Sequence, residues 1–191
     1  MSGLLKGFEL HGWQPDRRLS TDENFMDLCM IVTRSSKLKQ GSMACILAND
    51  SEEDLTTKKE SCDVIISVAN NRPLFSECDS DVHAEIAALG EACRHGRKTL
   101  GATAYITMPP CKKCFAALTV AGISKIVTRY DPPQKVRDTA IRNNIEFITI
   151  SNHTEQMARI NTLVYGNSSG KKRKNLDTDE ISTESIQKDK I

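Results

Sequence analysis

Two short segments of this chain together hold one histidine, one glutamate and a closely spaced pair of cysteines. His83 stands two positions before Glu85, and Pro110 is followed by Cys111 and, three positions later, by Cys114. Zinc prefers four ligands, and three protein ligands leave one position for water. His83 and the two cysteines supply three, so Glu85 is left free to move protons. A fold that uses this pattern must bring both segments to one place, which makes the pattern the strongest constraint on the architecture.

Both segments are predicted to open helices. Pro110 ends an apolar run, and proline is well placed at a helix start. Cys111 and Cys114 stand at i and i+3, so they share one face of a helix. In the first turn the helix dipole favours negative charge, which lowers the pKa of a thiol and prepares thiolates for zinc. His83 likewise follows a loop and begins an apolar helical stripe.

Three other interpretations fit parts of the pattern. A Cys-x-x-Cys pair can be a redox dithiol, but that interpretation gives no role to His83 or Glu85. The zinc can be structural, with Cys78 or Cys93 as the fourth ligand. His83 can also be an ordinary core histidine. The complete combination, with each half opening a helix after a break, favours a catalytic metal site.

Predicted strands and helices alternate along most of the chain. Apolar residues recur at helical spacing or in short β-branched runs, and Gly, Pro and Asn turns separate them. We expect helices over residues 21–34, 83–96, 111–121, 136–142 and 153–165, and strands over 43–48, 64–69, 103–107, 123–128 and 146–150. The first two strands can pair as a long-looped hairpin. Alternation after residue 83 implies a parallel or mixed sheet with helices on both faces.

Three regions follow from this pattern. Residues 1–19 form an N-terminal arm without periodicity, docked by Phe8 and Trp13. Residues 20–166 form the catalytic domain. Residues 167–191 contain almost no large apolar side chains, which predicts a disordered polar tail.

The predicted tail carries one basic run. Four consecutive basic residues are a candidate nuclear import signal, and the alternative is a tail that only aids solubility. These residues are Lys171, Lys172, Arg173 and Lys174. Several acidic residues follow closely, and their charge argues against tight binding of nucleic acid to the run.

Composition limits the classes of partner. The net charge of +1 gives no argument for a nucleic-acid partner from bulk charge. No apolar run approaches the roughly 20 residues that cross a bilayer, so we expect no membrane association. The first residues lack the apolar core of a secretory signal. Seven cysteines, an odd count, favour reduced thiols and an intracellular protein of the cytoplasm, the nucleus or both.

The combination of His83-Ala84-Glu85 with Pro110-Cys111 and Cys114 resembles the cytidine/deoxycytidylate deaminase superfamily, over about residues 22–150. The resemblance implies a three-layer α/β/α sandwich around a five-stranded mixed sheet, with Zn²⁺ at two helix starts. It implies a hydrolase with Glu85 as proton shuttle, acting at C4 of cytosine or C6 of adenine. It also implies a homo-oligomer, or a hetero-oligomer with a related chain.

Two branches of the superfamily compete for the substrate. The segment 22–26 and the triplet 44–46 are similar to deoxycytidylate deaminases, which act on a cytosine nucleotide and release ammonia. Ala87 departs from that branch, which usually has asparagine there. Asn71-Arg72-Pro73 instead resembles bacterial-type tRNA adenosine deaminases, for which RNA would be a partner, although Pro109 departs from their usual glutamate. We favour the cytosine nucleotide.

A third alternative is a non-catalytic deaminase-fold subunit. Chains of that kind commonly lose the motif glutamate, and this chain keeps Glu85.

Four residues are candidate substrate contacts. Asn70 or Asn71 corresponds, by similarity, to an asparagine that both branches place near the sugar or base edge, and Ala84 lies between two motif residues. Arg72 is a candidate phosphate ligand, because its planar fork suits phosphate oxygens. The alternatives are an asparagine that satisfies its own turn and a solvated arginine.

Overall fold

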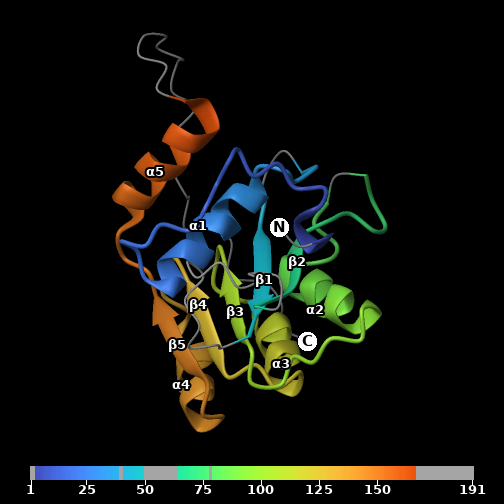
Figure 1. Ribbon diagram of the computed structural model, residues 1–191. Coiled ribbons are helices and arrows are strands. Elements are labelled where there is room, and N and C mark those ends of the chain that lie inside the picture. Colours follow the sequence, from blue (N-terminus) through green and yellow to red (C-terminus); the bar gives the residue numbers. More distant parts are fainter. Residues whose placement is uncertain (1–2, 39–40, 50–63, 78, 167–191) are drawn as a thin grey trace, which may run out of the picture.

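The structure is a computed structural model that describes residues 3–38, 41–49, 64–77 and 79–166 (Figure 1). The helices are the short 3-10 helix η1 (Gly3–Leu5) and the α-helices α1 (Thr21–Thr33), α2 (Ala84–Arg94), α3 (Lys112–Val120), α4 (Gln134–Arg142) and α5 (His153–Tyr165). The strands are β1 (Ala44–Ala48), β2 (Ile65–Asn70), β3 (Thr103–Ile106), β4 (Lys125–Thr128) and β5 (Glu146–Thr149).

The strands form one mixed sheet in the order β2-β1-β3-β4-β5. β1 pairs antiparallel with β2 and with β3, while β3, β4 and β5 run parallel. The predicted hairpin of the first two strands and the predicted five-stranded mixed sheet are therefore confirmed.

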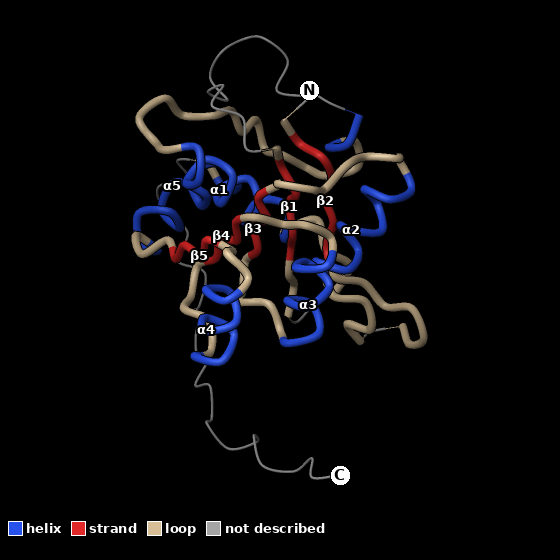
Figure 2. Tube along the Cα trace, turned by 90° about the horizontal axis from the view of Figure 1, so that it is seen from below, coloured by secondary structure: helices blue, strands red, loops and turns tan. Residues whose placement is uncertain are grey.

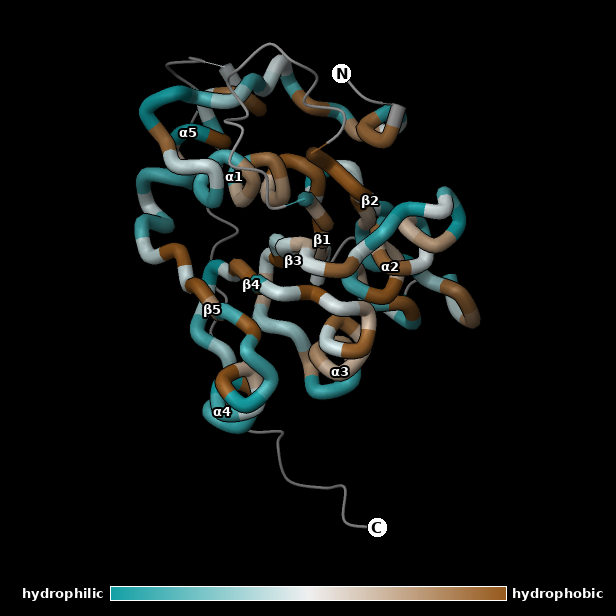
Figure 3. The backbone as a smooth tube through the Cα atoms, turned by 60° about the horizontal axis from the view of Figure 1, so that its bottom comes forward, coloured by the Kyte–Doolittle hydropathy of each residue, from teal (hydrophilic) through white to brown (hydrophobic). Residues whose placement is uncertain are grey.

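Helices cover both faces of the sheet. Seen from below, the strands form a layer with α1 and α5 on one side and α2, α3 and α4 on the other (Figure 2). Strand side chains alternate between the two faces, so β3 sends Ile106 into the core under α2–α4 and Tyr105 into the core under α1 and α5. Hydrophobic residues accordingly gather in the strands, whereas α4 is largely hydrophilic (Figure 3). The expected three-layer α/β/α sandwich is confirmed.

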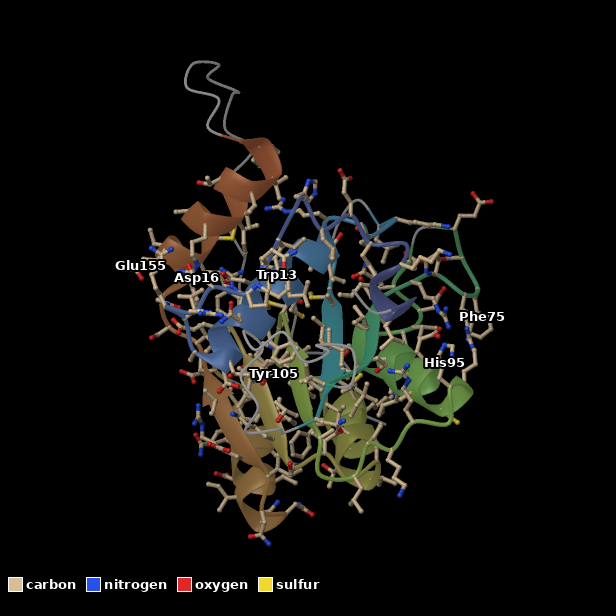
Figure 4. The ribbon with its side chains drawn as sticks, in the orientation of Figure 1. Trp13, Asp16, Phe75, His95, Tyr105 and Glu155 are labelled. Carbon is tan, nitrogen blue, oxygen red and sulfur yellow. The ribbon has the colours of Figure 1, made fainter. Side chains whose placement is uncertain are left out.

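Buried polar contacts attach α1 to the rest of the fold. Asp27 of α1 accepts hydrogen bonds at 2.8 and 3.0 Å from the guanidinium of Arg159 on α5. Asp22 at the start of α1 accepts one from the Tyr105 hydroxyl at 2.9 Å. The N-terminal arm packs against this layer through Trp13, which is buried as predicted and lies near α1 (Figure 4).

Strand β4 begins two residues later than the sequence predicts. The strand expected from residue 123 starts at Lys125, because Ile123 belongs to the closing turn of α3. Its backbone N–H donates to the Leu118 carbonyl at 3.1 Å, and Gly122 takes a positive φ of 80°. This arrangement ends helices commonly and suits glycine, which has no Cβ to clash. The predicted tail, including Lys171 to Lys174, lies outside the described residues.

Candidate metal and catalytic centre

His83, Cys111 and Cys114 lie together, as the sequence predicts. The Nδ1 atom of His83 is 3.8 Å from the Cys111 sulfur and 3.4 Å from the Cys114 sulfur. The three candidate ligand atoms all lie within 4.8 Å of one another. Tetrahedral zinc with ordinary bond lengths separates such nitrogen and sulfur ligands by about 3.5 Å. The spacing and donor types therefore fit a zinc ion.

Each half of the cluster stands at a helix start. His83 is the N-cap of α2, and Cys111 is the N-cap of α3. The Cys111 sulfur accepts a hydrogen bond from the Cys114 backbone N–H at 3.5 Å, so it caps the helix in the way a serine oxygen does. Because α2 and α3 cover the same face of the sheet, their first turns meet.

Hydrogen bonds to the sheet position the segment that leads to Cys111. Thr107, directly after β3, donates its backbone N–H to the Ala44 carbonyl at 3.2 Å and accepts the Ala44 N–H on its hydroxyl at 3.2 Å. This double contact anchors the segment that leads to Cys111. On the other side, Ala84 is fully buried in the core under α2, where its small side chain lets the helix start lie close to the sheet.

Glu85 reaches the cluster without being needed as a ligand. Glu85 is only 5% exposed, and its carboxyl group lies close enough to the Cys114 side chain for each to shift the pKa of the other. Burial raises the pKa of this carboxyl above its ordinary value. A carboxyl with a raised pKa, held beside a metal-ligand cluster, has the properties of a general acid and base.

The pKa of Cys114 corrects one expectation from the sequence. The helix dipole was expected to lower it, but burial and the neighbouring Glu85 carboxylate raise the pKa of this thiol well above its ordinary value. In this pocket desolvation outweighs the helix dipole. A bound cation would reverse the balance, because coordination deprotonates a thiol outright.

Among the described residues, the other three cysteines do not belong to the cluster. Cys93 is exposed and stands nine residues into α2, away from its first turn, and Cys29 and Cys45 are buried in the two cores. Cys93 is therefore no fourth ligand, and Cys78 lies outside the described residues.

The two candidate asparagines have different environments. Asn71 is buried, and its amide donates to the Gly41 carbonyl and the Ser80 hydroxyl and accepts the Met43 N–H, each at 2.8 Å. It holds three chain segments together at the end of the sheet. Asn70 donates to the Val32 carbonyl at 3.0 Å, while its buried Oδ1 has no hydrogen-bond partner among the described residues.

Asn70, Asn71 and Arg72 also line a cavity of about 800 Å³ along the outer edge of β2. The arm contributes Lys6 and Phe8 to the same cavity. Arg72 is exposed, and its backbone pairs with Val82. None of the zinc-ligand candidates lines this cavity, so the structure does not bring these candidate substrate contacts and the cluster into one cavity.

The sequence interpretation missed how the loop before His83 is held. One carboxylate oxygen of Asp81 accepts the backbone N–H groups of Leu74, Phe75 and Ser76, at 2.9, 2.9 and 3.1 Å. Aspartate is a common turn residue because its side chain accepts hydrogen bonds from nearby backbone N–H groups, so Asp81 within a polar loop was a sequence signal for this turn.

Among the described helices, none is long and apolar enough to cross a bilayer.

The chain is similar to known proteins over the region that carries the cluster. The family model for the cytidine and deoxycytidylate deaminase zinc-binding region matches residues 19–130. The chain is 36% identical over 87 residues to deoxycytidylate deaminase of Enterobacteria phage T4, covering 44% of this chain and 45% of that protein. It is 37% identical over 89 residues to the riboflavin biosynthesis protein RibD of Buchnera aphidicola, covering 41% and 23%. The matched part thus spans less than half of each of these curated relatives.

Solved structures show the same fold. The dCMP deaminase from cyanophage S-TIM5 superimposes with a TM-score of 0.55 at 17% identity, covering 69% of this chain and all of that one. RibD of Acinetobacter baumannii gives a TM-score of 0.50 at 20% identity, covering 77% of this chain and 40% of that one. The family match, which includes both halves of the His83, Cys111 and Cys114 cluster, shows that the chain belongs to the cytidine and deoxycytidylate deaminase family.

Proposed function

We propose that the chain is a zinc-dependent hydrolytic deaminase of a cytosine nucleotide, of the deoxycytidylate type, which converts C to U and releases ammonia. The observation that carries this proposal is the cluster of His83, Cys111 and Cys114 with the buried carboxyl of Glu85 beside it. Three ligands and one separate acid–base group are what hydrolysis at an amino-substituted ring carbon requires.

His83, Cys111 and Cys114 would hold the zinc. When bound, zinc supplies a Lewis acid that lowers the pKa of water and so provides a nucleophile at neutral pH. The chain's own contribution is the placement of these three ligands by two helix starts, which leaves the remaining side of the cluster for water and substrate.

Glu85 would move the protons. Its carboxylate takes a proton from the attacking water, passes it to the ring nitrogen next to the reacting carbon, and then assists departure of the amine as ammonia. The buried position of Glu85 supports this role, because its raised pKa brings the carboxyl nearer to the pH at which it must both accept and donate.

Support for a cytosine nucleotide comes from the relatives. The T4 and T2 phage proteins, 36% and 35% identical over the matched residues, are both deoxycytidylate deaminases. In this proposal Asn70, whose Oδ1 has no hydrogen-bond partner among the described residues, meets a donor of the sugar or base, and Arg72 meets the phosphate. Asn71 and Ala84, which are both buried, form part of the wall of the proposed substrate site. Residues 20–166 form the catalytic unit.

A substrate screen tests the proposal. Purified full-length protein loaded with zinc is incubated with dCMP, dCTP, cytidine or tRNA, and ammonia release is followed in a coupled assay. We expect turnover of dCMP well above that of cytidine. Conversion of adenosine to inosine in tRNA without turnover of any cytosine nucleotide would instead establish the RNA alternative. A zinc-loaded protein inactive on all four would support the partner-subunit alternative.

A further inference from the structure

A buried arginine directly after β4 has no anionic partner in the described part of the chain. Arg129 is 9% exposed, and its Nε atom is buried without a hydrogen-bond partner among the described residues. The nearest acid in sequence, Asp131, instead accepts hydrogen bonds from Arg137 at 2.7 Å and from the Thr149 hydroxyl at 2.8 Å. Burying a charge costs free energy unless an opposite charge or hydrogen bonds compensate it, so Arg129 has unused capacity to bind an anion.

The position of Arg129 is fixed by its neighbours. Its carbonyl accepts a hydrogen bond from Nε2 of His153 at the start of α5, and the Thr128 hydroxyl donates to the Tyr130 carbonyl at 2.7 Å. The guanidinium carbon lies 5.4 Å from the centre of the Tyr130 ring. A cation–π contact of this kind orients a guanidinium but supplies no negative charge. Arg129 is therefore held in place while its Nε donor stays unused.

Arg129 lies at the edge of the sheet that also carries the cluster. β3 and β4 are parallel neighbours in which Ile106 pairs with Thr128, so Arg129, one residue farther along, lies beside Thr107 (Figure 1). Neighbouring strands are about 4.8 Å apart. Thr107 leads into the segment that ends at Cys111, the N-cap of α3. In sheets with parallel strands, ligands bind outside the carboxyl ends of the strands, which is where Arg129 stands.

Arg129 shares a face of the sheet with another candidate substrate contact. Side chains alternate along a strand, and Val127 packs in the core under α1 and α5, so Arg129 lies on that face. Asn70 lies there too, because its amide donates to the Val32 carbonyl near the end of α1. β2 and β3 are both antiparallel to β1, so the carboxyl ends of β2, β3 and β4 are at the same edge. A substrate that reaches the cluster across the end of β3 passes between Asn70 and Arg129.

We propose that Arg129 binds the phosphate of the nucleotide substrate, in addition to Arg72, and makes the site select nucleotides over nucleosides. This inference rests on the proposed function, because it assigns a further contact to that substrate. A planar guanidinium suits two phosphate oxygens, and a phosphate supplies the negative charge that the buried group lacks. Arg72 is exposed, whereas Arg129 is shielded from water, so its contact with an anion is the stronger of the two.

Kinetics on two substrates that differ only in the phosphate test the proposal. Zinc-loaded full-length protein is assayed with dCMP and with deoxycytidine. Arg129→Gln should raise KM for dCMP by about 10-fold or more, the value of a hydrogen bond to a charged group, and leave deoxycytidine turnover unchanged. A merely structural role of Arg129 would affect both substrates alike. Arg129→Lys keeps the charge without the planar fork, so its KM for dCMP should lie between those of wild type and Arg129→Gln.

A second measurement needs no catalysis. The thermal unfolding midpoint of the zinc-loaded protein is followed as inorganic phosphate replaces sodium chloride at constant ionic strength. Phosphate should raise the midpoint of wild type but not that of Arg129→Gln, and the starting midpoint in chloride shows whether each variant is folded. Arg142→Gln, at an exposed arginine that ends α4, is the matched control and should respond as wild type does.

The two measurements separate failure of this inference from failure of the proposed function. Wild-type turnover of dCMP with an unchanged KM in Arg129→Gln would overturn the inference alone. A phosphate response that Arg129→Gln retains, or its absence from wild type, would overturn it whether or not dCMP is a substrate. A wild-type protein that does not turn over dCMP, yet responds to phosphate only through Arg129, would overturn the proposed function and support Arg129 as an anion ligand.

Discussion

His83 and Cys114 are 31 residues apart in the sequence, yet Nδ1 of the histidine lies 3.4 Å from the sulfur of the cysteine. The contact exists because α2 and α3 lie on the same face of the sheet and begin at the same end of it. Each helix start is ordinary when taken alone. Together the two starts place one histidine and two cysteines close enough to bind one metal ion.

The first prediction concerns metal content. Removing either cysteine leaves two protein ligands, which are too few to hold zinc tightly. Cys111→Ala and Cys114→Ala should therefore retain little zinc after dialysis, as measured by elemental analysis. Cys93→Ala, at an exposed cysteine outside the cluster, should retain about one zinc per chain. Full zinc content in both cluster variants would disprove the ligand assignment.

The second prediction separates proton transfer from metal binding. Glu85→Gln keeps the size of the side chain and removes its acid–base function, so zinc content should be unchanged. General acid–base groups contribute roughly 10²–10⁴-fold, and kcat should fall by at least that factor. Glu146→Gln, at an exposed residue of β5 outside the cluster and the cavity, is the control and should stay near wild type. An active Glu85→Gln enzyme would refute the proposed role.

The third prediction distinguishes the two asparagines. Asn71 makes three hydrogen bonds that join separate chain segments, so Asn71→Ala should destabilise the fold by about 2–4 kcal/mol. Asn70 makes one side-chain hydrogen bond, and its buried Oδ1 has no partner among the described residues, so under the proposed function this atom is left for the substrate. Asn70→Ala should mainly raise KM. Chemical unfolding and steady-state kinetics on both variants check this, and the reverse pattern would exchange their roles.

The fourth prediction concerns the attachment of α5. Asp27 is buried, and the side chain of its partner Arg159 is 25% exposed. Asp27→Ala leaves the guanidinium without its partner and should cost about 2–4 kcal/mol, somewhat less than for a fully buried pair. The exposed pair of Arg137 and Asp131 is the comparison, and Asp131→Ala should cost less than about 1 kcal/mol. Equal losses in urea unfolding would contradict this account.

The fifth prediction concerns acid. The Ser20 backbone N–H, then the Ser20 hydroxyl and Asn152, hydrogen-bond the carboxylate of Glu23 and lower its pKa. A lowered pKa in the folded state means that the carboxylate stabilises the fold above its unfolded pKa of about 4.3, and that this stability is lost as pH falls through the folded value. Glu23→Gln should therefore unfold at a lower temperature than wild type near neutral pH. The difference should shrink in acid, whereas a constant difference would argue against the capping contact.

Periodicity and turn residues were enough to predict the order of helices and strands in this chain. The helix over residues 153–165 and the pairing of β1 with β2 follow directly from local patterns, which are strong in these segments. The start of β4 was missed because Ile123 is apolar and β-branched, like a strand residue, while a local hydrogen bond to the Leu118 carbonyl assigns it to the end of α3. Gly122 marks that helix end in the sequence, but the apolar side chain of Ile123 was read as the first strand residue.

Within the candidate site, residue type predicted the cluster but not the environment of its members. The motif spacing led to His83, Cys111 and Cys114. The raised pKa of Cys114 depends on how deeply α3 packs, and the engagement of Asn71 depends on segments 30 residues away in sequence. Both are properties of packing, which single-residue chemistry does not determine.

The Cys111 sulfur both caps α3 and belongs to the ligand cluster, and it is exposed. Alkylation or oxidation of this one atom would take away a ligand and an N-cap in the same event. Protein stored without metal and without a reducing agent should thus lose more than zinc affinity. The first turn of α3 would fray, and added zinc would not restore it until the thiol itself was recovered.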